Sequence, residues 1–168
     1  MICVVEAATT RVAVVDDDRR FRDAVAAVLA ADPRFDLVGE VDTATGAGEL
    51  VRATRPDCVL VDVRLPGGGP LVVRTVLDTA DDIGLRPAVV AVSADVGPEA
   101  VREMLDAGVS GYLVKGGLGD VLADLLERCA RGEVVLAVPG AAEALAHLRR
   151  RAQHDPDGAP DGVGRAAG

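Results

Sequence analysis

Short apolar runs alternate with segments of helical period between residues 11 and 131. Five of these runs are bounded by charged or turn-forming residues, and each has the length of a strand. The predicted strands span residues 11–16, 35–41, 57–63, 87–94 and 111–115. Most of the runs are apolar at successive positions, which is typical of strands that are covered on both faces.

Segments with apolar residues three or four positions apart follow the runs and predict five helices. The longest stripe begins at Leu118 and ends before Gly132. A weaker stripe around 46–54 contains Gly46 and Gly48, which lower its helix propensity. Strands that alternate with helices form right-handed βαβ units on a parallel sheet. The pattern therefore predicts a doubly wound, three-layer α/β domain with helices on both faces of the sheet.

The pattern changes after Gly132. Residues 133–138 form a short apolar run, which is not counted among the five predicted strands. Residues 141–151 predict one further helix. From Ala152 onward the chain is rich in Gly, Pro, Asp and Ala without apolar periodicity, which predicts a disordered tail. The expected organisation is an N-terminal extension over 1–10, a folded domain over 11–131, a linker-like segment and helix over 132–151, and the tail over 152–168.

The acidic balance of the chain narrows the choice of partners. The 168 residues carry a formal net charge of −9, and their only tight basic cluster is Arg149 to Arg151. Such a chain is poorly suited to neutralising the phosphates of a nucleic acid. No apolar run approaches the ~18 residues of a membrane helix, and the first ten residues lack the features of a signal peptide. We therefore expect a cytoplasmic location, no membrane insertion and no direct nucleic-acid binding by this chain.

Three cysteines are widely spaced and form no CxxC pair. Cys3, Cys58 and Cys129 are therefore predicted to be small apolar fillers rather than disulfide partners or metal ligands.

Polar residues gather at the carboxyl ends of the predicted strands, where open parallel sheets bind their ligands. They are Asp16 and Asp17 after the first strand, Asp62 at the end of the third, Ser93 at the end of the fourth and Lys115 at the end of the fifth. Glu40 and Asp42 follow the second strand, which is expected at an edge of the sheet. Asp18 lies one position beyond the acidic pair and is predicted to cap the first helix instead.

The carboxylates, the hydroxyl and the ammonium in this set can act together chemically. Clustered carboxylates repel one another unless a cation lies among them, and Mg²⁺ prefers oxygen ligands while it keeps several waters. One carboxylate can then act as a nucleophile and form an acyl phosphate. An ammonium and a hydroxyl can hold the remaining phosphoryl oxygens as charge develops on them.

Several motifs in this order resemble the receiver domain of two-component response regulators over roughly residues 11–131. The matching stretches are VVDD at 14–17, PDCVLVDVRLPGG at 56–68, VVAVSA at 89–94 and AGVSGYLVKG at 107–116. The last stretch, with the helix after it, is most similar to the LuxR/FixJ (NarL-like) subfamily. The resemblance implies a flavodoxin-like fold whose five strands have the order 2-1-3-4-5.

The resemblance also implies a role for each site residue. Asp62 would accept the phosphoryl group, and Mg²⁺ would be held by Asp17 directly and by Asp16 through water. Asp62 itself and the backbone carbonyl of Arg64 would complete the protein's metal ligands. The expected donor is the phosphohistidine of a sensor histidine kinase.

Three further residues would respond to the phosphoryl group. Ser93 and Lys115 would bind its oxygens, and Tyr112 would change rotamer together with Ser93 and move inward. Ala94 would keep the path to the phosphoacceptor open, because a large side chain there would crowd it. The chain would act as a phosphoacceptor switch that assists its own phosphorylation and dephosphorylation rather than as an enzyme. The face of the fourth helix, fifth strand and fifth helix would then bind a partner or form a homodimer.

Two positions depart from the pattern. Gly116 follows Lys115 where many receivers have proline, which makes a cis peptide less expected here. Arg64 places a bulky cation where small or polar side chains are common, and we expect it to alter the lifetime of the phosphoryl group.

Two alternatives remain open at this point. A haloacid-dehalogenase-like phosphatase would use Asp16 to Asp18 as a DxD motif and Gly119 to Asp124 as GDxxxD, but it leaves Asp62 unexplained. The chain could also be the receiver portion of a LuxR/FixJ-type DNA-binding regulator whose helix-turn-helix output domain is absent from these 168 residues. We favour a single-domain receiver.

Overall fold

A parallel sheet forms the centre of the molecule. The structure, a computed structural model, describes residues 8–94, 97–117, 119–139, 141–142, 145–146 and 150. The strands are β1 (Thr10–Val15), β2 (Phe35–Val41), β3 (Cys58–Asp62), β4 (Ala88–Ser93), β5 (Gly111–Val114) and β6 (Val135–Ala137). The helices are α1 (Arg19–Ala30), α2 (Ala47–Thr54), α3 (Pro70–Asp82), α4 (Pro98–Ala107) and α5 (Asp120–Ala130), with 3₁₀ turns η1 (Ala44–Gly46) and η2 (Lys115–Gly117).

The strand order is β2-β1-β3-β4-β5-β6, with every neighbouring pair parallel. The predicted order of the first five strands is confirmed, and β2 lies at an edge as expected. The expectation of five strands is wrong, because part of the 133–138 run adds a sixth strand beside β5. Three residues suffice for this strand because the neighbouring edge of β5 supplies partners for their backbone groups.

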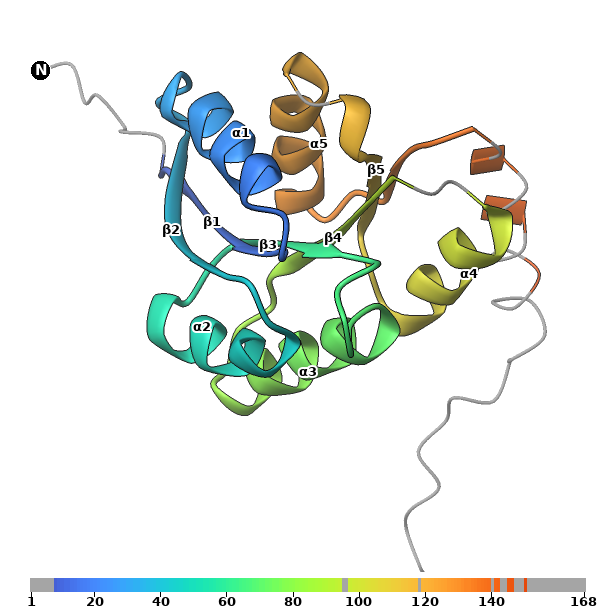
Figure 1. Ribbon diagram of the computed structural model, residues 1–168, viewed down its shortest axis with the longest axis horizontal. Coiled ribbons are helices and arrows are strands. Elements are labelled where there is room, and N and C mark those ends of the chain that lie inside the picture. Colours follow the sequence, from blue (N-terminus) through green and yellow to red (C-terminus); the bar gives the residue numbers. More distant parts are fainter. Residues whose placement is uncertain are drawn as a thin grey trace, which may run out of the picture.

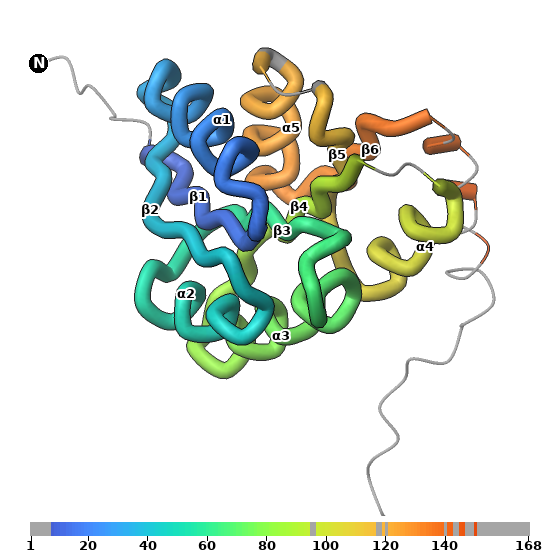
Figure 2. The backbone as a smooth tube through the Cα atoms, viewed as in Figure 1, coloured from blue at the N-terminus to red at the C-terminus, as the bar shows by residue number. Residues whose placement is uncertain are grey.

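Helices cover both faces of the sheet, as Figures 1 and 2 show. Alternate residues of each strand enter different apolar clusters, since successive side chains of a strand point to opposite faces. Ala13 and Val59 belong to the cluster with residues of α2, α3 and α4. Val14 and Leu60 belong to the cluster with residues of α1 and α5. Both faces of the central strands β3 and β4 are therefore buried, and the polar residues of these two strands, Asp62 and Ser93, lie at their carboxyl ends.

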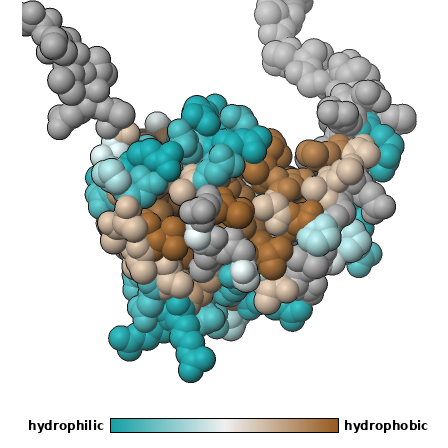
Figure 3. Space-filling model, turned by 90° about the horizontal axis from the view of Figure 1, so that it is seen from above, coloured by the Kyte–Doolittle hydropathy of each residue, from teal (hydrophilic) through white to brown (hydrophobic). Residues whose placement is uncertain are grey.

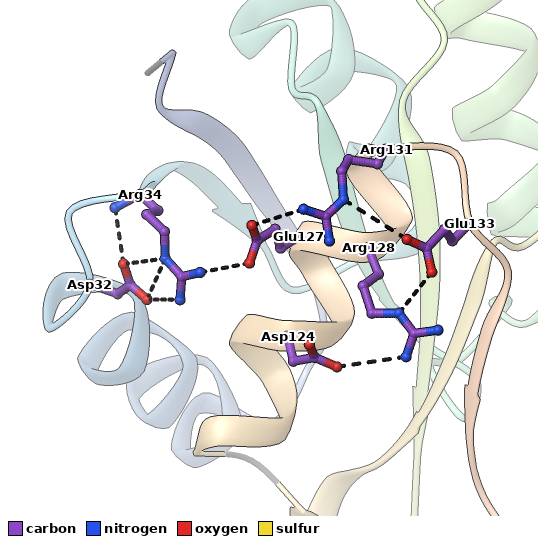
Figure 4. Close-up of polar contacts among 7 residues, drawn as sticks. All are labelled: Asp32, Arg34, Asp124, Glu127, Arg128, Arg131 and Glu133. Carbon is purple, nitrogen blue, oxygen red and sulfur yellow. Dashed lines mark hydrogen bonds and ion pairs between the residues drawn. The ribbon is translucent and has the colours of Figure 1, made fainter. Parts of the chain in front are cut away.

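Charged side chains connect α5 to the segments on either side of it (Figure 4). Arg34, in the turn before β2, contacts Asp32 and Glu127 at 2.6 Å each. Arg128 of α5 and Arg131, the residue after this helix, bind Glu133 in the connection to β6, at 2.8 and 3.9 Å. These groups are partly exposed, so each pair is worth at most about 1 kcal/mol. The network lies near the amino ends of β2 and β6, on the edge of the sheet opposite the acidic residues.

The face that carries α1 and α5 is also partly apolar. Figure 3 views the molecule from this side, and a band of apolar surface crosses the middle of the face. The exposed large apolar residues of α5 and the α5–β6 connection are Val121, at 47% exposure, and Val134, at 51%. This side therefore combines apolar surface with the charges of α5.

The cysteines, the C-terminal segment and the absence of a membrane helix were also predicted from the sequence. Cys58 and Cys129 are buried and free, as expected of apolar fillers, whereas Cys3 lies outside the described residues. In the predicted helix 141–151, residues 141–142, 145–146 and 150 are helical and the others lie outside the described residues. The tail over 152–168 also lies outside them. None of the described helices has the length and apolar character needed to cross a bilayer.

Candidate functional site

Three charged side chains converge at the carboxyl edge of the sheet. Asp16 follows β1, Asp62 ends β3 and Lys115 follows β5. Each lies two positions after a residue whose side chain enters the α1 and α5 cluster: Val14, Leu60 and Leu113. Because the side-chain period of a strand is two, all three side chains project toward the same face. Asp16 is fully buried and Asp62 is 3% exposed.

Lys115 bridges the two buried carboxylates. Its Nζ lies 3.0 Å from Oδ1 of Asp16 and 3.1 Å from Oδ2 of Asp62, and it donates a hydrogen bond to each. The same Nζ lies 2.8 Å from Oδ2 of Asp16. That contact is an ion pair without hydrogen-bond geometry, so Oδ2 of Asp16 is buried with no hydrogen-bond donor. The lysine side chain itself is only 17% exposed.

Backbone amides fix the orientation of both carboxylates. The Asp18 amide donates to Oδ1 of Asp16 at 2.8 Å, and the Arg64 amide donates to Oδ1 of Asp62 at 2.9 Å. In each case the donor lies two residues after the acceptor, which is the local turn that aspartate favours. The carboxylates are thus oriented by the chain that follows their own strands.

The environment shifts the proton equilibria of this cluster. Burial raises the pKa of Asp16, and the hydrogen bonds from Lys115 and the Asp18 amide offset only part of that effect. For Lys115, burial acts to lower the pKa, but the hydrogen bonds to Asp16 and Asp62 outweigh burial and the pKa is raised. The ammonium therefore stays protonated at neutral pH and supplies the positive charge that the buried carboxylates need.

The residues fit a divalent cation that prefers oxygen. Asp16, Asp17 and Asp62 each offer a carboxylate oxygen, and the three oxygens lie within 4.8 Å of one another. Asp17 is exposed, so one side of the cluster faces water. Three carboxylates with access to solvent suit Mg²⁺, which keeps part of its water shell.

Ser93 and Tyr112 lie on the other side of the sheet. Ala91, which pairs with Tyr112, enters the α2, α3 and α4 cluster, and Ser93 follows it by two residues. Ser93 and Tyr112 are both fully buried, and Tyr112 is part of that same cluster. The structure therefore places the predicted switch pair on one face at neighbouring strands, with Tyr112 already inside the core.

Two residues near the site were not predicted from the sequence. The Lys115 Nζ lies 4.8 Å from the centroid of the Phe21 ring, and the Arg22 guanidinium donates to the backbone carbonyl of Asp16 at 2.7 Å. Periodicity identifies Phe21 only as a core residue, because the lysine that it meets follows β5, far along the chain. Nothing in the local sequence distinguishes Arg22 from the exposed Arg19 and Arg20 before it.

The other positions near the site are placed as follows. Asp18 caps α1 and accepts from the Arg20 and Phe21 amides, which confirms its predicted role. Glu40 takes no part in the carboxylate cluster and pairs with Arg22 at 3.3 Å. The peptide bond between Lys115 and Gly116 is trans, since none of the described residues has a cis peptide bond.

The described residues do not support the phosphatase alternative. The cluster able to hold a metal contains Asp62 and excludes both Asp18 and Asp124. Asp18 caps α1, and Asp124 is an exposed residue of α5 that pairs with Arg128. Both aspartates of the GDxxxD stretch lie on α5, and Asp124 is not a member of the carboxylate cluster.

A carboxylate pocket bridged by a lysine, at the carboxyl edge of a flavodoxin-like parallel sheet, defines the receiver class of α/β domain. Residues 12–127 match the family model of the response regulator receiver domain. The chain belongs to the response regulator receiver family, and the resemblance inferred from the sequence is confirmed.

Known proteins agree with this assignment. The chain is 34% identical over 144 residues to the DNA-binding transcriptional activator DevR/DosR of Mycobacterium tuberculosis, covering 85% of this chain and 64% of that protein. It is 31% identical over 142 residues to the probable transcriptional regulatory protein NarL of the same species, covering 84% and 64%. The chain thus spans slightly less than two thirds of the length of each of these two relatives.

Solved structures agree with the fold. The signal receiver domain of NarL from Mycobacterium tuberculosis aligns with a TM-score of 0.68 and 32% identity, covering 74% of this chain and 98% of that one. A LuxR-family response regulator from Aurantimonas sp. SI85-9A1 aligns with a TM-score of 0.72 and 26% identity, covering 85% and 99%. The flavodoxin-like fold is therefore confirmed.

Proposed function

We propose that the chain accepts a phosphoryl group on Asp62 from the phosphohistidine of a sensor histidine kinase. The observation that carries this proposal is the position of Asp62, which is buried between the Lys115 ammonium and the Arg64 amide beside two further carboxylates. Membership of the receiver family supports the same assignment. The donor's phosphorus–nitrogen bond breaks as a carboxylate oxygen of Asp62 bonds to phosphorus, and the bonding electrons return to the histidine ring.

The protein's own groups prepare Asp62 for this reaction. The Arg64 amide fixes the plane of the carboxylate through Oδ1, and Lys115 donates to Oδ2. As the phosphoryl group bonds to Asp62, the Lys115 ammonium shifts from the carboxylate to a phosphoryl oxygen, and the Ser93 hydroxyl donates to another. Both donors act on charge that develops during transfer, which is where electrostatic stabilisation lowers a barrier.

Mg²⁺ completes the proposed site. Asp16, Asp17 and Asp62 would hold the ion through their carboxylates, and the backbone carbonyl of Arg64 would be a further ligand, as the receiver resemblance implies. When bound, the ion would supply positive charge for the phosphoryl oxygens, which the acidic cluster would otherwise repel. The side chain of Arg64 is exposed at this edge and is expected to change the lifetime of the acyl phosphate.

The phosphorylated site would control a surface on the other side of the sheet. Ser93 and Tyr112 are buried on the face that contacts α4, and movement of Ser93 toward a phosphoryl group would change the packing around Tyr112. A shift from mostly inactive to mostly active needs about 5.5 kcal/mol of differential binding. Two or three charge-assisted hydrogen bonds, each worth about 1.5–3 kcal/mol, are sufficient.

The proposed output is the α4, β5 and α5 surface, which would bind a partner or a second copy. The protein would act as a phosphoacceptor switch and not as an enzyme that turns over a separate substrate. Its relatives are described as transcriptional regulators, so a DNA-binding output in a longer version of the chain is the alternative. Size-exclusion chromatography before and after phosphorylation tests the homodimer.

Intact mass spectrometry after incubation with Mg²⁺ and acetyl phosphate tests the phosphoacceptor. The wild-type chain should gain the mass of one PO₃ group, and Asp62→Asn should gain none. Asp57→Asn is the matched control, because Asp57 is an exposed residue immediately before the same strand, at its opposite end. Equal labelling of the Asp62→Asn variant, or no labelling of wild type, rejects the proposal.

A further inference from the structure

We propose that Phe21 is a positioning residue for Lys115, and that its ring holds the ammonium in place between Asp16 and Asp62. The consequence for phosphoryl transfer rests on the proposed function. The placement of the ammonium does not, because it follows from contacts within the folded chain. None of the motifs by which the sequence resembles a receiver domain includes a residue of α1 as a partner of Lys115.

The contact has the geometry of a cation–π interaction. The Lys115 Nζ lies 4.8 Å from the centroid of the Phe21 ring, inside the limit of about 6 Å for such pairs. Phe21 is only 5% exposed and belongs to the apolar cluster between α1, α5 and the sheet. Water therefore screens the attraction little, since the lysine side chain is also mostly buried.

The ring is tied to the same turn that orients Asp16. Asp18 accepts from the Phe21 amide through its side chain and donates its own amide to Asp16. This turn joins the end of β1 to the start of α1 and carries both a carboxylate partner and the aromatic partner of the ammonium. A rotation of α1 would therefore move the ring and the Asp16 carboxylate together.

Phe21 supplies what the two carboxylates cannot. Asp16 and Asp62 hold Nζ through charge-assisted hydrogen bonds, and phosphorylation would change the charge and the shape of Asp62. A neutral ring keeps its attraction for the ammonium throughout that change. We infer that Phe21 keeps Lys115 within reach of the phosphoryl oxygens while its contact with the Asp62 carboxylate is lost.

The composition of the chain makes this inference testable. Lys115 is the single lysine among the 168 residues, so isotope-labelled lysine reports on this side chain alone. Phe35 is the only other phenylalanine, and it provides a matched control. It is similarly buried, at 7% exposure, in the same cluster, and a different cation, Arg34, lies 5.4 Å from its ring centroid.

Nuclear magnetic resonance of the lysine-labelled full chain, without divalent cation, is the direct test. Protons above an aromatic face are shifted upfield, so the ε-methylene protons of Lys115 should resonate upfield of those of a free lysine. Phe21→Leu should remove this shift, whereas Phe21→Tyr and Phe35→Leu should retain it. An unshifted wild-type signal, or a shift that persists in folded Phe21→Leu, overturns the inference, and the wild-type spectrum decides even if the leucine variant does not fold.

Phosphorylation kinetics with acetyl phosphate and Mg²⁺ form the second arm. Phe21→Leu should be labelled about three- to tenfold more slowly than wild type, and Phe21→Tyr should recover most of the rate. Equal slowing by Phe35→Leu would assign the effect to lost packing and reject a positioning role. If wild type takes up no phosphate while the upfield shift is present and depends on Phe21, the proposed function fails and the placement of Lys115 by the ring stands.

Discussion

Arg22 donates a hydrogen bond from Nη1 to the backbone carbonyl of Asp16 at 2.7 Å. Its Nε also pairs with Glu40 of β2 at 3.3 Å, so one guanidinium joins α1, the end of β1 and an edge strand. The arginine side chain is 13% exposed, whereas that of Glu40 is 43% exposed. The contact with the carbonyl is therefore the less screened of the two, and it fixes the backbone that presents the first aspartate of the site.

We expect Arg22→Ala to lower the free energy of unfolding by about 1.5–3 kcal/mol, the usual worth of a hydrogen bond to a charged donor. Arg19→Ala on the same helix should change it by less than about 0.5 kcal/mol, because that side chain is 84% exposed. Urea denaturation of both variants measures the difference. Equal effects of the two substitutions would contradict the stabilising role of the hydrogen bond from Arg22 to the Asp16 carbonyl.

The bridge formed by Lys115 predicts a change in the response to magnesium. Lys115→Met leaves Asp16 and Asp62 without their shared cation, and we expect a loss of about 1–3 kcal/mol in buffer free of divalent ions. Added MgCl₂ should stabilise this variant more than wild type, because the ion no longer competes with the ammonium for the carboxylates. Thermal denaturation with and without MgCl₂ measures the effect. Equal stabilisation of both proteins would exclude such competition.

The loop after Asp62 requires a glycine at position 68. A Cβ there would lie 2.5 Å from the Leu65 carbonyl oxygen and 2.7 Å from the Leu65 Cβ. Both distances are shorter than van der Waals contact, so the backbone of the loop would have to shift. Gly68→Ala should therefore cost about 1–3 kcal/mol of stability. It should also slow phosphorylation, because this loop connects the site to α3.

Gly116→Ala is the control for this prediction. A Cβ at Gly116 would meet nothing within 4 Å, although the residue lies next to Lys115. Its stability should stay within about 0.5 kcal/mol of wild type. Chemical denaturation of both variants decides between them, and a neutral Gly68→Ala would show that the loop yields to the added methyl group.

The two buried thiols predict a loss of stability in alkaline solution. Burial raises the pKa of Cys58 to about 12 and that of Cys129 to about 11. An unfolded cysteine ionises near pH ~8.5, so above that pH the unfolded state binds fewer protons than the native state. Stability should therefore fall as pH rises through this window, by about 1.4 kcal/mol per pH unit for each thiol.

A variant with Cys58→Ala and Cys129→Ala tests the source of this slope. Both proteins are unfolded in urea at a series of pH values from about 8 to about 10.5, and the slopes of unfolding free energy against pH are compared. The double variant should have the shallower slope. Parallel slopes would assign the alkaline loss to other groups.

The sequence determined the elements and the main members of the site. Strand and helix positions followed from apolar periodicity, because each element buries one face, and apolar residues recur along the chain with the period of that face. The acidic pair, Asp62 and Lys115 could be predicted together because parallel strands bring their carboxyl ends to one edge.

The sixth strand could not be predicted with the same rule. The 133–138 run is short, and its strand has only three residues, which hold their conformation because β5 offers them partners. A long strand is marked by its own side chains, whereas this one depends on an edge that another part of the chain supplies. The apolar run was visible in the sequence, but its pairing was not.

Only the tertiary structure decided how Lys115 is held. Phe21 precedes it by 94 positions, as their residue numbers show, and the ring meets the ammonium because α1 covers the face of the sheet toward which the Lys115 side chain projects. Arg22 likewise differs from its neighbours only through the strands that it reaches. A single sequence marks which residues carry charge and which face the core. Contacts between distant segments are set by packing, and here packing determines which core residue lies against the lysine of the site.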